Sequence, residues 1–528
     1  MAQRRQTIIR VLLIFGIITI LNVIAVRIFT RLDLTSSKMY TLSGASKNLV
    51  RSLDDKFLVK AYFTSDLPAP YNNNRRYLQD QLDEYRAYSR GNFQYEFVDP
   101  SKKEDLEQEA QRYGIPPVQV QVLKEDKFQV EKAYMGLVFL YGDKQERLPV
   151  IQQTDNLEYE ISSAMKKLTS KELKKIGFLS GQGEPQLQQM NRLKDVLEKQ
   201  YQLTPVDLTG GKPIPPDIAV LLIVAPSQPF KSWEKFLIDQ YLMKGGKVAF
   251  FLNKVEASLQ NQTGRPLNLD IDDLLEAYGA RINTDLVRDV RCAMVTVSQQ
   301  TGFFVIQNQI PFPYLPMASD FSKANPIVKD LGSVIFFFVS SIDTSLVRAK
   351  GLSADVLVKS SNRSGRQEGV FYFNPTAPMT KEMFSESGIP LAVAIEGSYT
   401  SAFRDKPVVL DSAVHSSIDT TKRLVAGKAS RIAVVGDGDF VQDQYSGGNK
   451  DNIIFASNIV DWLADDIGLA TIRSRETGSK PLAEVSEGTK SLVKGLNLAA
   501  PPLLVVVVGV LRWRWRATMR KRLESRGL

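Results

Sequence analysis

The chain is nearly without cysteine and histidine, since its 528 residues contain one of each. The single cysteine, Cys292, excludes an internal disulfide, a Cys-x-x-Cys redox motif and a zinc site built from cysteines. The single histidine, His415, removes nearly all metal binding and acid–base catalysis that depend on imidazole. The pattern Gly-x-x-x-x-Gly-Lys-Ser/Thr is also absent, which excludes ATP binding through a P-loop. We therefore predict no cofactor and no metal.

The main part of the chain also lacks an excess of positive charge. The formal net charge is +9, a value that alone suggests nucleic acid or an acidic surface as a partner. Five arginines and no acidic residue fall in the first 31 residues, and seven basic residues and one acidic residue fall in the last 17, which leaves about −2 for residues 32–511. The basic residues flank the two chain ends, where they suit membrane lipids. Nothing indicates a nucleic-acid partner.

An apolar run near the start of the chain, residues 11–29, approaches the roughly 20 residues that cross a bilayer core. Arginines flank it, it is too long for the apolar part of a signal peptide, and no small-residue cleavage site follows. We predict an uncleaved membrane anchor, with a buried core helix as the alternative. Thr19 and Asn22 are predicted to hydrogen-bond a partner helix, a contribution of about 0.6 kcal/mol.

A second apolar run, in residues 496–515, ends in alternating tryptophan and arginine, which favour a membrane–water boundary. Pro501 and Pro502 fit the first turn of a helix, where a missing N–H costs little. A valine-rich strand buried in a sheet is the alternative. By the positive-inside rule, the termini at 1–10 and 516–528 are cytoplasmic, so the bulk of the chain is predicted to be periplasmic at the bacterial inner membrane.

Between the two spans, strand and helix patterns predict an α/β protein. We place a juxtamembrane linker and helix at 30–56, a thioredoxin-like α/β domain at 57–155, a helical connector at 156–174, a doubly wound α/β domain at 175–253 and 431–465 with an irregular, β-rich insertion at 254–430, and a tether at 466–495. The thioredoxin-like order is βαβα followed by a hairpin led by Pro117. A generic α/β sandwich is the alternative. The redox cysteines of a thioredoxin are absent, so only a binding scaffold is predicted.

Two loops follow predicted buried strands at the edge where doubly wound sheets bind ligands. Gly181 and Gly183, with Glu184 beside them, favour either an anion held on helix amides or a tight turn that needs glycine torsions. Asp437 and Asp439 favour either a cation or, for Asp439, a helix cap, because two carboxylates are few for Mg²⁺ or Ca²⁺. These five residues are the predicted ligand contacts, and no catalytic residue is predicted.

The sequence resembles the GldG family, the auxiliary membrane component of the ABC transporter associated with bacterial gliding motility. The resemblance covers almost the whole chain and depends on the order of its motifs, which are Asp33-Leu34-Thr35, Tyr40-Thr41-Leu42-Ser43, Ser180-Gly181-Gln182-Gly183-Glu184, Gly436-Asp437-Gly438-Asp439-Phe440, Asn458 with Asp461-Trp462-Leu463, and the arginine-rich tail. The family often has histidine where Gln182 stands. The resemblance implies a separate permease and ATPase as partners and a central fold similar to class I glutamine amidotransferases.

Such an amidotransferase needs a cysteine nucleophile with histidine and glutamate. Cys292 lies in the irregular region rather than at a strand-to-helix elbow, so we expect a scaffold without catalysis. The main hypothesis is a non-enzymatic transporter subunit that presents a periplasmic domain. The alternatives are a periplasmic binding module for glycan or peptide, which uses the two loops, and an amidotransferase-like or metal-dependent hydrolase that uses Asp437 and Asp439.

Overall fold

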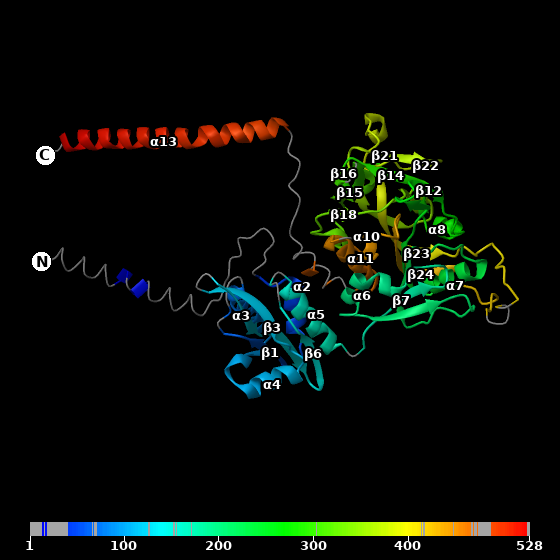
Figure 1. Cartoon of the computed structure of the whole chain (residues 1–528), viewed down its shortest axis with the longest axis horizontal. Helices are drawn as coiled ribbons and strands as arrows, with labels where there is room; N and C mark the ends of the chain where they lie inside the picture. Colours follow the sequence, from blue (N-terminus) through cyan, green and yellow to red (C-terminus); the bar gives the residue numbers. More distant parts are fainter. Residues whose placement is uncertain are drawn as a thin grey trace. The chain divides into compact units, whose positions relative to one another are not determined.

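The computed structural model describes most of the chain. The described residues are 13–14, 16–17, 41–65, 67, 71–124, 127–151, 154, 156–170, 172–301, 304–412, 414, 418–446, 448–465, 468, 472–473 and 487–524. Most of the predicted first span, with Thr19 and Asn22, lies outside the described residues, as does His415. We call residues 41–170 the N-terminal lobe and residues 172–465 the central lobe (Figure 1).

The N-terminal lobe is a four-stranded sheet with helices on both faces. Its elements are α2 (Gly44–Arg51), β1 (Phe57–Phe63), η1 (Tyr71–Asn73), α3 (Asn74–Tyr88), β2 (Phe93–Val98), η2 (Pro100–Lys102), α4 (Glu104–Arg112), β3 (Val118–Lys124), β4 (Lys127–Ala133), β5 (Met135–Tyr141), β6 (Lys144–Leu148) and α5 (Leu157–Thr169). The strand order is β2-β1-β5-β6, in which β1 is parallel to β2 and antiparallel to β5. Assignment to the thioredoxin-like fold stays a prediction.

The alternation of side chains along β1 explains the two layers. Phe57, Val59 and Phe63 point to one face, where they pack with α2, α3 and α5. Tyr62 points to the other face and packs with Ala110 of α4. Because successive side chains of a strand point to opposite faces, one apolar run serves both cores. The strands that follow Pro117, β3 and β4, pair with each other in antiparallel register from Val118 with Ala133 to Lys124 with Lys127.

Helix α5 lies within the bounds predicted for the helical connector, 156–174. It runs from Leu157 to Thr169 and buries most of its length, so it is part of the core of this lobe. Ile161 and Met165 are fully buried against the sheet, while Lys166 and Lys167 lie in the last turn. The basic residues occupy only the exposed side, where positive charge suits the C-terminal end of the helix dipole.

The central lobe contains an eight-stranded sheet in the order β17-β20-β23-β24-β10-β9-β7-β8. Its elements up to the sheet centre are β7 (Lys175–Ser180), η3 (Leu187–Gln189), α6 (Asn191–Leu197), β8 (Gln202–Asp207), β9 (Ile218–Val224), α7 (Ser232–Met243) and β10 (Lys247–Phe251). Its last elements are β20 (Ser353–Lys359), α9 (Leu346–Ala349), β23 (Pro390–Thr400), β24 (Ala426–Val435), α10 (Asp443–Ser446) and α11 (Lys450–Leu463). Strands β8, β7, β9, β10 and β24 are parallel.

Apolar residues alternate between the two faces of this sheet. Leu222, Phe251 and Val435 belong to the core that also contains α6 and α11. Leu221 and Phe250 belong to the opposite core, which contains α7 and α8. Strands buried on both faces read as continuous apolar runs, which is why the strands at 218–224 and 247–251 were predictable from sequence.

The predicted insertion at 254–430 is wrong in one respect, because part of it belongs to the main sheet. Strands β23 and β20 extend the sheet beyond β24 in antiparallel register, and the short β17 (Asp320–Phe321) closes that edge. Part of the rest forms a smaller β-rich region (Figure 1), with its own core around Phe312, Tyr314 and Phe373. The other elements between 254 and 430 are β11 (Val255–Ser258), β12 (Thr263–Pro266), α8 (Asp272–Ala277), β13 (Arg281–Ile282), β14 (Asp285–Asp289), β15 (Cys292–Thr301), β16 (Phe304–Ala318), η4 (Pro326–Val328), β18 (Val334–Ile335), β19 (Ile342–Asp343), β21 (Ser364–Glu368), β22 (Phe371–Tyr372) and η5 (Lys381–Phe384). Of these, α8, β13, β19 and η4 pack in the cores of the main sheet.

The C-terminal helix α13 (Glu487–Glu524) forms a unit of its own. Its stretch Gly488–Thr518 is, among the described residues, the one helix long and apolar enough to cross a membrane, and none of its apolar window is buried in protein. The helix takes in residues 487–495, which were predicted as tether. Pro501 and Pro502 lie inside it rather than in its first turn, because the helix begins earlier than the apolar run.

The end of β24 generates a first test. A methyl group added at Gly436 meets the carbonyl oxygen of Ser340 at 2.0 Å, whereas one added at Gly210 meets nothing within 4 Å. We expect Gly436→Ala to lower the free energy of unfolding by about 1–3 kcal/mol, because backbone cannot yield as a flexible side chain does. Gly210→Ala is the matched control, and denaturant unfolding of the two variants is the measurement. Equal unfolding midpoints would contradict the packing described.

Candidate functional site

The two predicted ligand loops lie at the same edge of the central sheet but are not in contact with each other. Gly181–Glu184 follows β7 and Asp437–Asp439 follows β24, with β9 and β10 between them. At about 4.8 Å per strand, three steps separate the loops by about 14 Å. The loop after β9 fills the space: Ala225 lies against Gly438, and the Ser227 N–H donates to the Gln182 carbonyl at 2.9 Å.

The loop after β7 uses its glycines for backbone torsions. Gly181 and Gly183 have φ of 114° and 77°, which side chains other than glycine rarely adopt. A methyl group at Gly183 meets the Ser227 hydroxyl oxygen at 2.2 Å, so the loop after β7 and the loop after β9 approach closely here. The backbone torsions and this close approach explain why glycine occupies both positions, as the tight-turn interpretation predicts.

The polar groups of this loop do not favour an anion. The Gln182 N–H, the amide best placed to hold one, already donates to Oε2 of Glu184 at 2.8 Å. The buried Gln182 side chain donates to Oε1 of Glu234 at 3.0 Å. Burial raises the pKa of Glu184, and the nearby charge of Glu234 raises it further. Two carboxyl groups that already resist ionisation oppose a third negative charge. Glu184 stays a predicted ligand contact only for a neutral or donor group.

The loop after β24 is built around a fully buried carboxyl group. Asp437 accepts the N–H of Phe337 and the N–H of Asp439, both at 2.7 Å. The Gly438 N–H donates to the Asn253 side chain at 2.7 Å, and Gln442 donates to Asp439 at 2.6 Å. Asp437 therefore joins the end of β24 to the segment after β18. The described residues contain no group of three or more His, Cys, Asp or Glu side chains that could hold a metal.

Burial also changes the protonation of this acid pair. It raises the pKa of Asp437 well above its usual range, and the charge of Asp439 raises it further. Burial raises the pKa of Asp439 to about 6. The pair therefore retains a proton at mildly acidic pH, because two adjacent carboxylates in a buried site do not readily ionise together.

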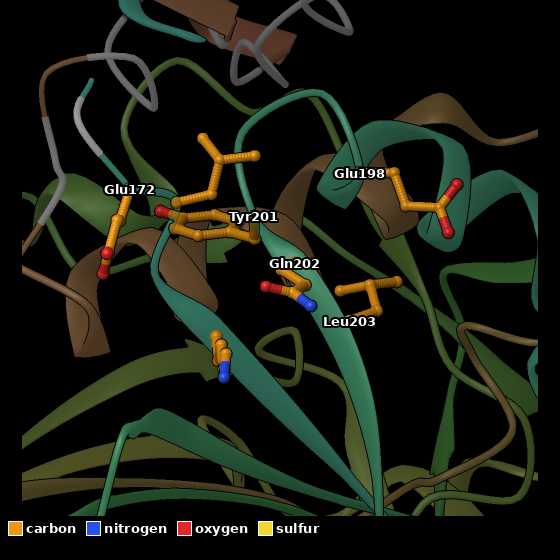
Figure 2. A pocket seen from close by; sticks show the side chains of 7 residues that line it. Glu172, Glu198, Tyr201, Gln202 and Leu203 are labelled. Carbon is orange, nitrogen blue, oxygen red and sulfur yellow. The ribbon is translucent and has the colours of Figure 1, made fainter.

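A pocket of about 700 Å³ lies elsewhere, at the N-terminal ends of β7 and β8 (Figure 2). Its lining residues are Glu172, Leu173, Lys175, Glu198, Tyr201, Gln202 and Leu203. Lys175 pairs with Asp217 at 2.6 Å, and Glu198 pairs with Lys194 at 4.0 Å. Doubly wound sheets bind ligands at the opposite, carboxyl ends of their strands. The pocket therefore does not coincide with the predicted ligand loops.

The one cysteine is not placed as a nucleophile. Cys292 begins β15 in the β-rich region, outside the main sheet. Burial raises the pKa of its thiol to about 11, and the charge of Asp289 contributes in the same direction. A thiol needs its thiolate form to attack, so at neutral pH this side chain is unreactive.

Sequence reasoning missed the partners that hold the two loops. Asn253 directly follows a buried strand, which is a position where polar side chains commonly serve a site. Glu234 stands in the first turn of α7, where its carboxylate accepts the Lys231 N–H at 2.8 Å. The acidic residue at a helix start was visible in the sequence. Its pairing with Gln182 was not, because it depends on how two loops meet.

Comparison with known proteins covers most of the chain. Residues 173–465 match the family model described as an ABC-type uncharacterized transport system. Residues 36–140 match a domain of unknown function. An uncharacterized protein of Borreliella burgdorferi is 23% identical over 502 residues, which are 93% of this chain and 94% of that protein. Among solved structures, the N-terminal domain of mmIFT52 aligns with a TM-score of 0.32 and 14% identity, covering 55% of this chain and 97% of that domain.

The acid pair after β24 generates a pH-dependent prediction. Between about pH 3.8 and 6, folded Asp439 holds a proton that an unfolded aspartate has released. The folded state then binds more protons, so the contribution of this residue to stability falls as pH rises through about 6. We expect Asp439→Asn to remove this loss. The free energy of unfolding of the variant should rise by about 1–3 kcal/mol relative to that of the wild type between acidic and neutral pH.

The measurement is the unfolding midpoint of both proteins across this pH range. Asp405→Asn is the matched control, because the Asp405 side chain is 89% exposed. The control should follow the wild type at each pH. A constant difference between Asp439→Asn and the wild type would contradict the assigned protonation.

Proposed function

Because the chain belongs to the ABC transporter auxiliary family, we propose that it is a non-enzymatic subunit that associates with a separate permease and a separate ATPase. The family match over residues 173–465 is the observation that carries this proposal. The chain itself has no P-loop pattern, so the ATP-dependent step must be performed by another chain. Association with the separate ATPase supplies that step.

The apolar surface of α13 supports placement in the membrane. Leu504, Val505 and Val506 expose 64%, 71% and 61% of their surfaces, and the helix continues into Trp513 and Trp515. Exposed valines and leucines over several turns are unfavourable in water and favourable in lipid. We propose a two-pass protein of the bacterial inner membrane, with residues 11–29 as the other span, cytoplasmic termini and periplasmic lobes.

The chemistry of the central lobe supports a binding or relay role rather than catalysis. Asp437 is occupied by two backbone N–H groups, and Gln182 and Glu234 bond each other. The thiol of Cys292 has a pKa of about 11 and lies outside the main sheet. Membership in the gliding-motility branch of the family is the finer proposal, supported by the motif order along the sequence.

The test is purification of the full-length chain from its own membranes in mild detergent. We expect a multi-span permease and a P-loop ATPase to be recovered with it in a fixed ratio. The double variant Val506→Arg with Val507→Arg should reduce that recovery at least tenfold, because each arginine at mid-membrane costs about 2.5–3.5 kcal/mol.

The matched control places the same two charges near the start of α13, as Thr489→Arg with Ser491→Arg, outside the apolar run predicted to span. It should recover both partners as the wild type does. Recovery of the wild-type chain alone, under conditions that keep other transporters intact, would exclude a constitutive subunit.

A further inference from the structure

The segment that follows the predicted first span is hydrogen-bonded to buried glutamates of the N-terminal lobe from residue 42 onward. The Leu42 N–H donates to Oε2 of Glu84 at 2.7 Å, and the Ser43 N–H donates to Oε1 of Glu158 at 2.6 Å. The hydroxyl of Ser46 donates to the same Glu158 oxygen at 2.6 Å. Both glutamates are buried, so these charge-assisted bonds are protected from water.

The segment that leads toward α13 contacts Tyr159, the residue of α5 that follows Glu158. Arg473 is 4% exposed, and its Nη2 lies 3.1 Å from the hydroxyl oxygen of Tyr159. Its guanidinium also lies over the Tyr159 ring, 4.9 Å from the ring centre. Ile472 is fully buried in a cluster with Tyr159, against which Ala45 packs. The prediction of a polar tether at 466–495 is therefore wrong for residues 472–473.

The same arginine reaches the central lobe. Its Nη2 pairs with Oδ2 of Asp461 at 3.1 Å, and its Nη1 donates to Oδ1 of Asn458 at 3.2 Å, both on α11. Asp461 is fully buried and accepts the Tyr201 hydroxyl at 2.7 Å. A buried guanidinium is tolerated when its charge is paired, and the contacts of Nη1 and Nη2 with α5 and α11 define the position of Arg473, while its Nε has no hydrogen-bond partner among the described residues.

The first turn of α5 also contacts the central lobe directly. Oε1 of Glu160 lies 2.7 Å from the Lys199 ammonium, and the Gln200 side chain donates to the Tyr159 hydroxyl at 2.8 Å. Three consecutive residues of α5, Glu158 to Glu160, thus bind the N-terminal segment, the C-terminal segment and the central lobe.

We propose that the first turn of α5 is the common attachment point for the segments that lead to the two predicted membrane spans. Residues 30–40 lead from this turn to the first predicted span, and residues 474–495, of which 487–495 belong to α13, lead to the second. A displacement of one span relative to the other then acts on α5 and on the joint between the lobes. This role deepens the proposed function, since a permease that moves the spans would move the lobes through α5.

Coupling between the two fastened segments is the property that distinguishes this role from two independent structural contacts. In the full-length chain in detergent, we expect Arg473→Met to raise amide hydrogen exchange at residues 41–47 at least tenfold. Coupling is reciprocal, so Glu158→Met should raise exchange at residues 472–473 by a similar factor. Amides of β9 and β10 report whether the central lobe remains folded and should be unchanged.

Arg431→Met is the matched control, because Arg431 also forms ion pairs, with Asp465 and Glu396, and stacks on Trp462 within the central lobe. It should leave residues 41–47 unchanged. If Arg473→Met unfolds the central lobe, Tyr159→Phe takes its place. This variant removes only the hydroxyl shared by Arg473 and Gln200, and it should likewise raise amide exchange at residues 41–47.

Faster exchange confined to 472–473, or equal effects of Arg473→Met and Arg431→Met at 41–47, would overturn the proposal. Because the measurement needs no partner protein, its outcome is independent of whether a permease and an ATPase copurify. If exchange at the two segments is coupled but the chain is recovered without a permease and an ATPase, the transporter function is contradicted and the attachment point is retained.

Discussion

The buried contact of Arg473 with Asp461 and Tyr159 is the interaction on which the arrangement of the two lobes depends. Asp461 belongs to the central lobe, Tyr159 to the N-terminal lobe, and Arg473 to the segment that follows both. Removing Arg473 or Asp461 leaves an unpaired buried charge, a change that typically costs about 3–5 kcal/mol. The cost of misplacing this arginine favours one relative position of the lobes over others.

The carboxyl edge of the central sheet, where doubly wound proteins usually bind ligands, is closely packed with backbone. Gly438 is pressed against Ala225, and Gly436 against Ser340, so backbone fills the space that a ligand occupies in related architectures. The polar groups there bond one another, as Asp437 does with Phe337 and Asp439.

Sequence patterns were sufficient where structure depends on neighbouring residues. The apolar strands β9 and β10 and the helix α7 lie within the segment 175–253 that was predicted as alternating strands and helices, because burial on two faces or one leaves a local signature. Strand β23 was missed since its place in the sheet depends on pairing with β24. The polar stretch around Arg473 gave no sign of burial, because its partners come from α5 and α11. The five predicted ligand contacts lie after β7 and β24 in two loops that do not touch each other, and their role as ligand contacts stays a prediction.

The most direct test is whether the C-terminal segment lies against the N-terminal lobe in native membranes. A Cβ atom built at Gly468 lies 3.5 Å from that of Ala45, within the range of a disulfide. In a Cys292→Ser background, Ala45→Cys with Gly468→Cys should form an intramolecular disulfide on mild oxidation. Leu140→Cys with Gln145→Cys, at paired positions of β5 and β6, is the positive control. Free thiols at 45 and 468 while the control pair oxidises would contradict the account.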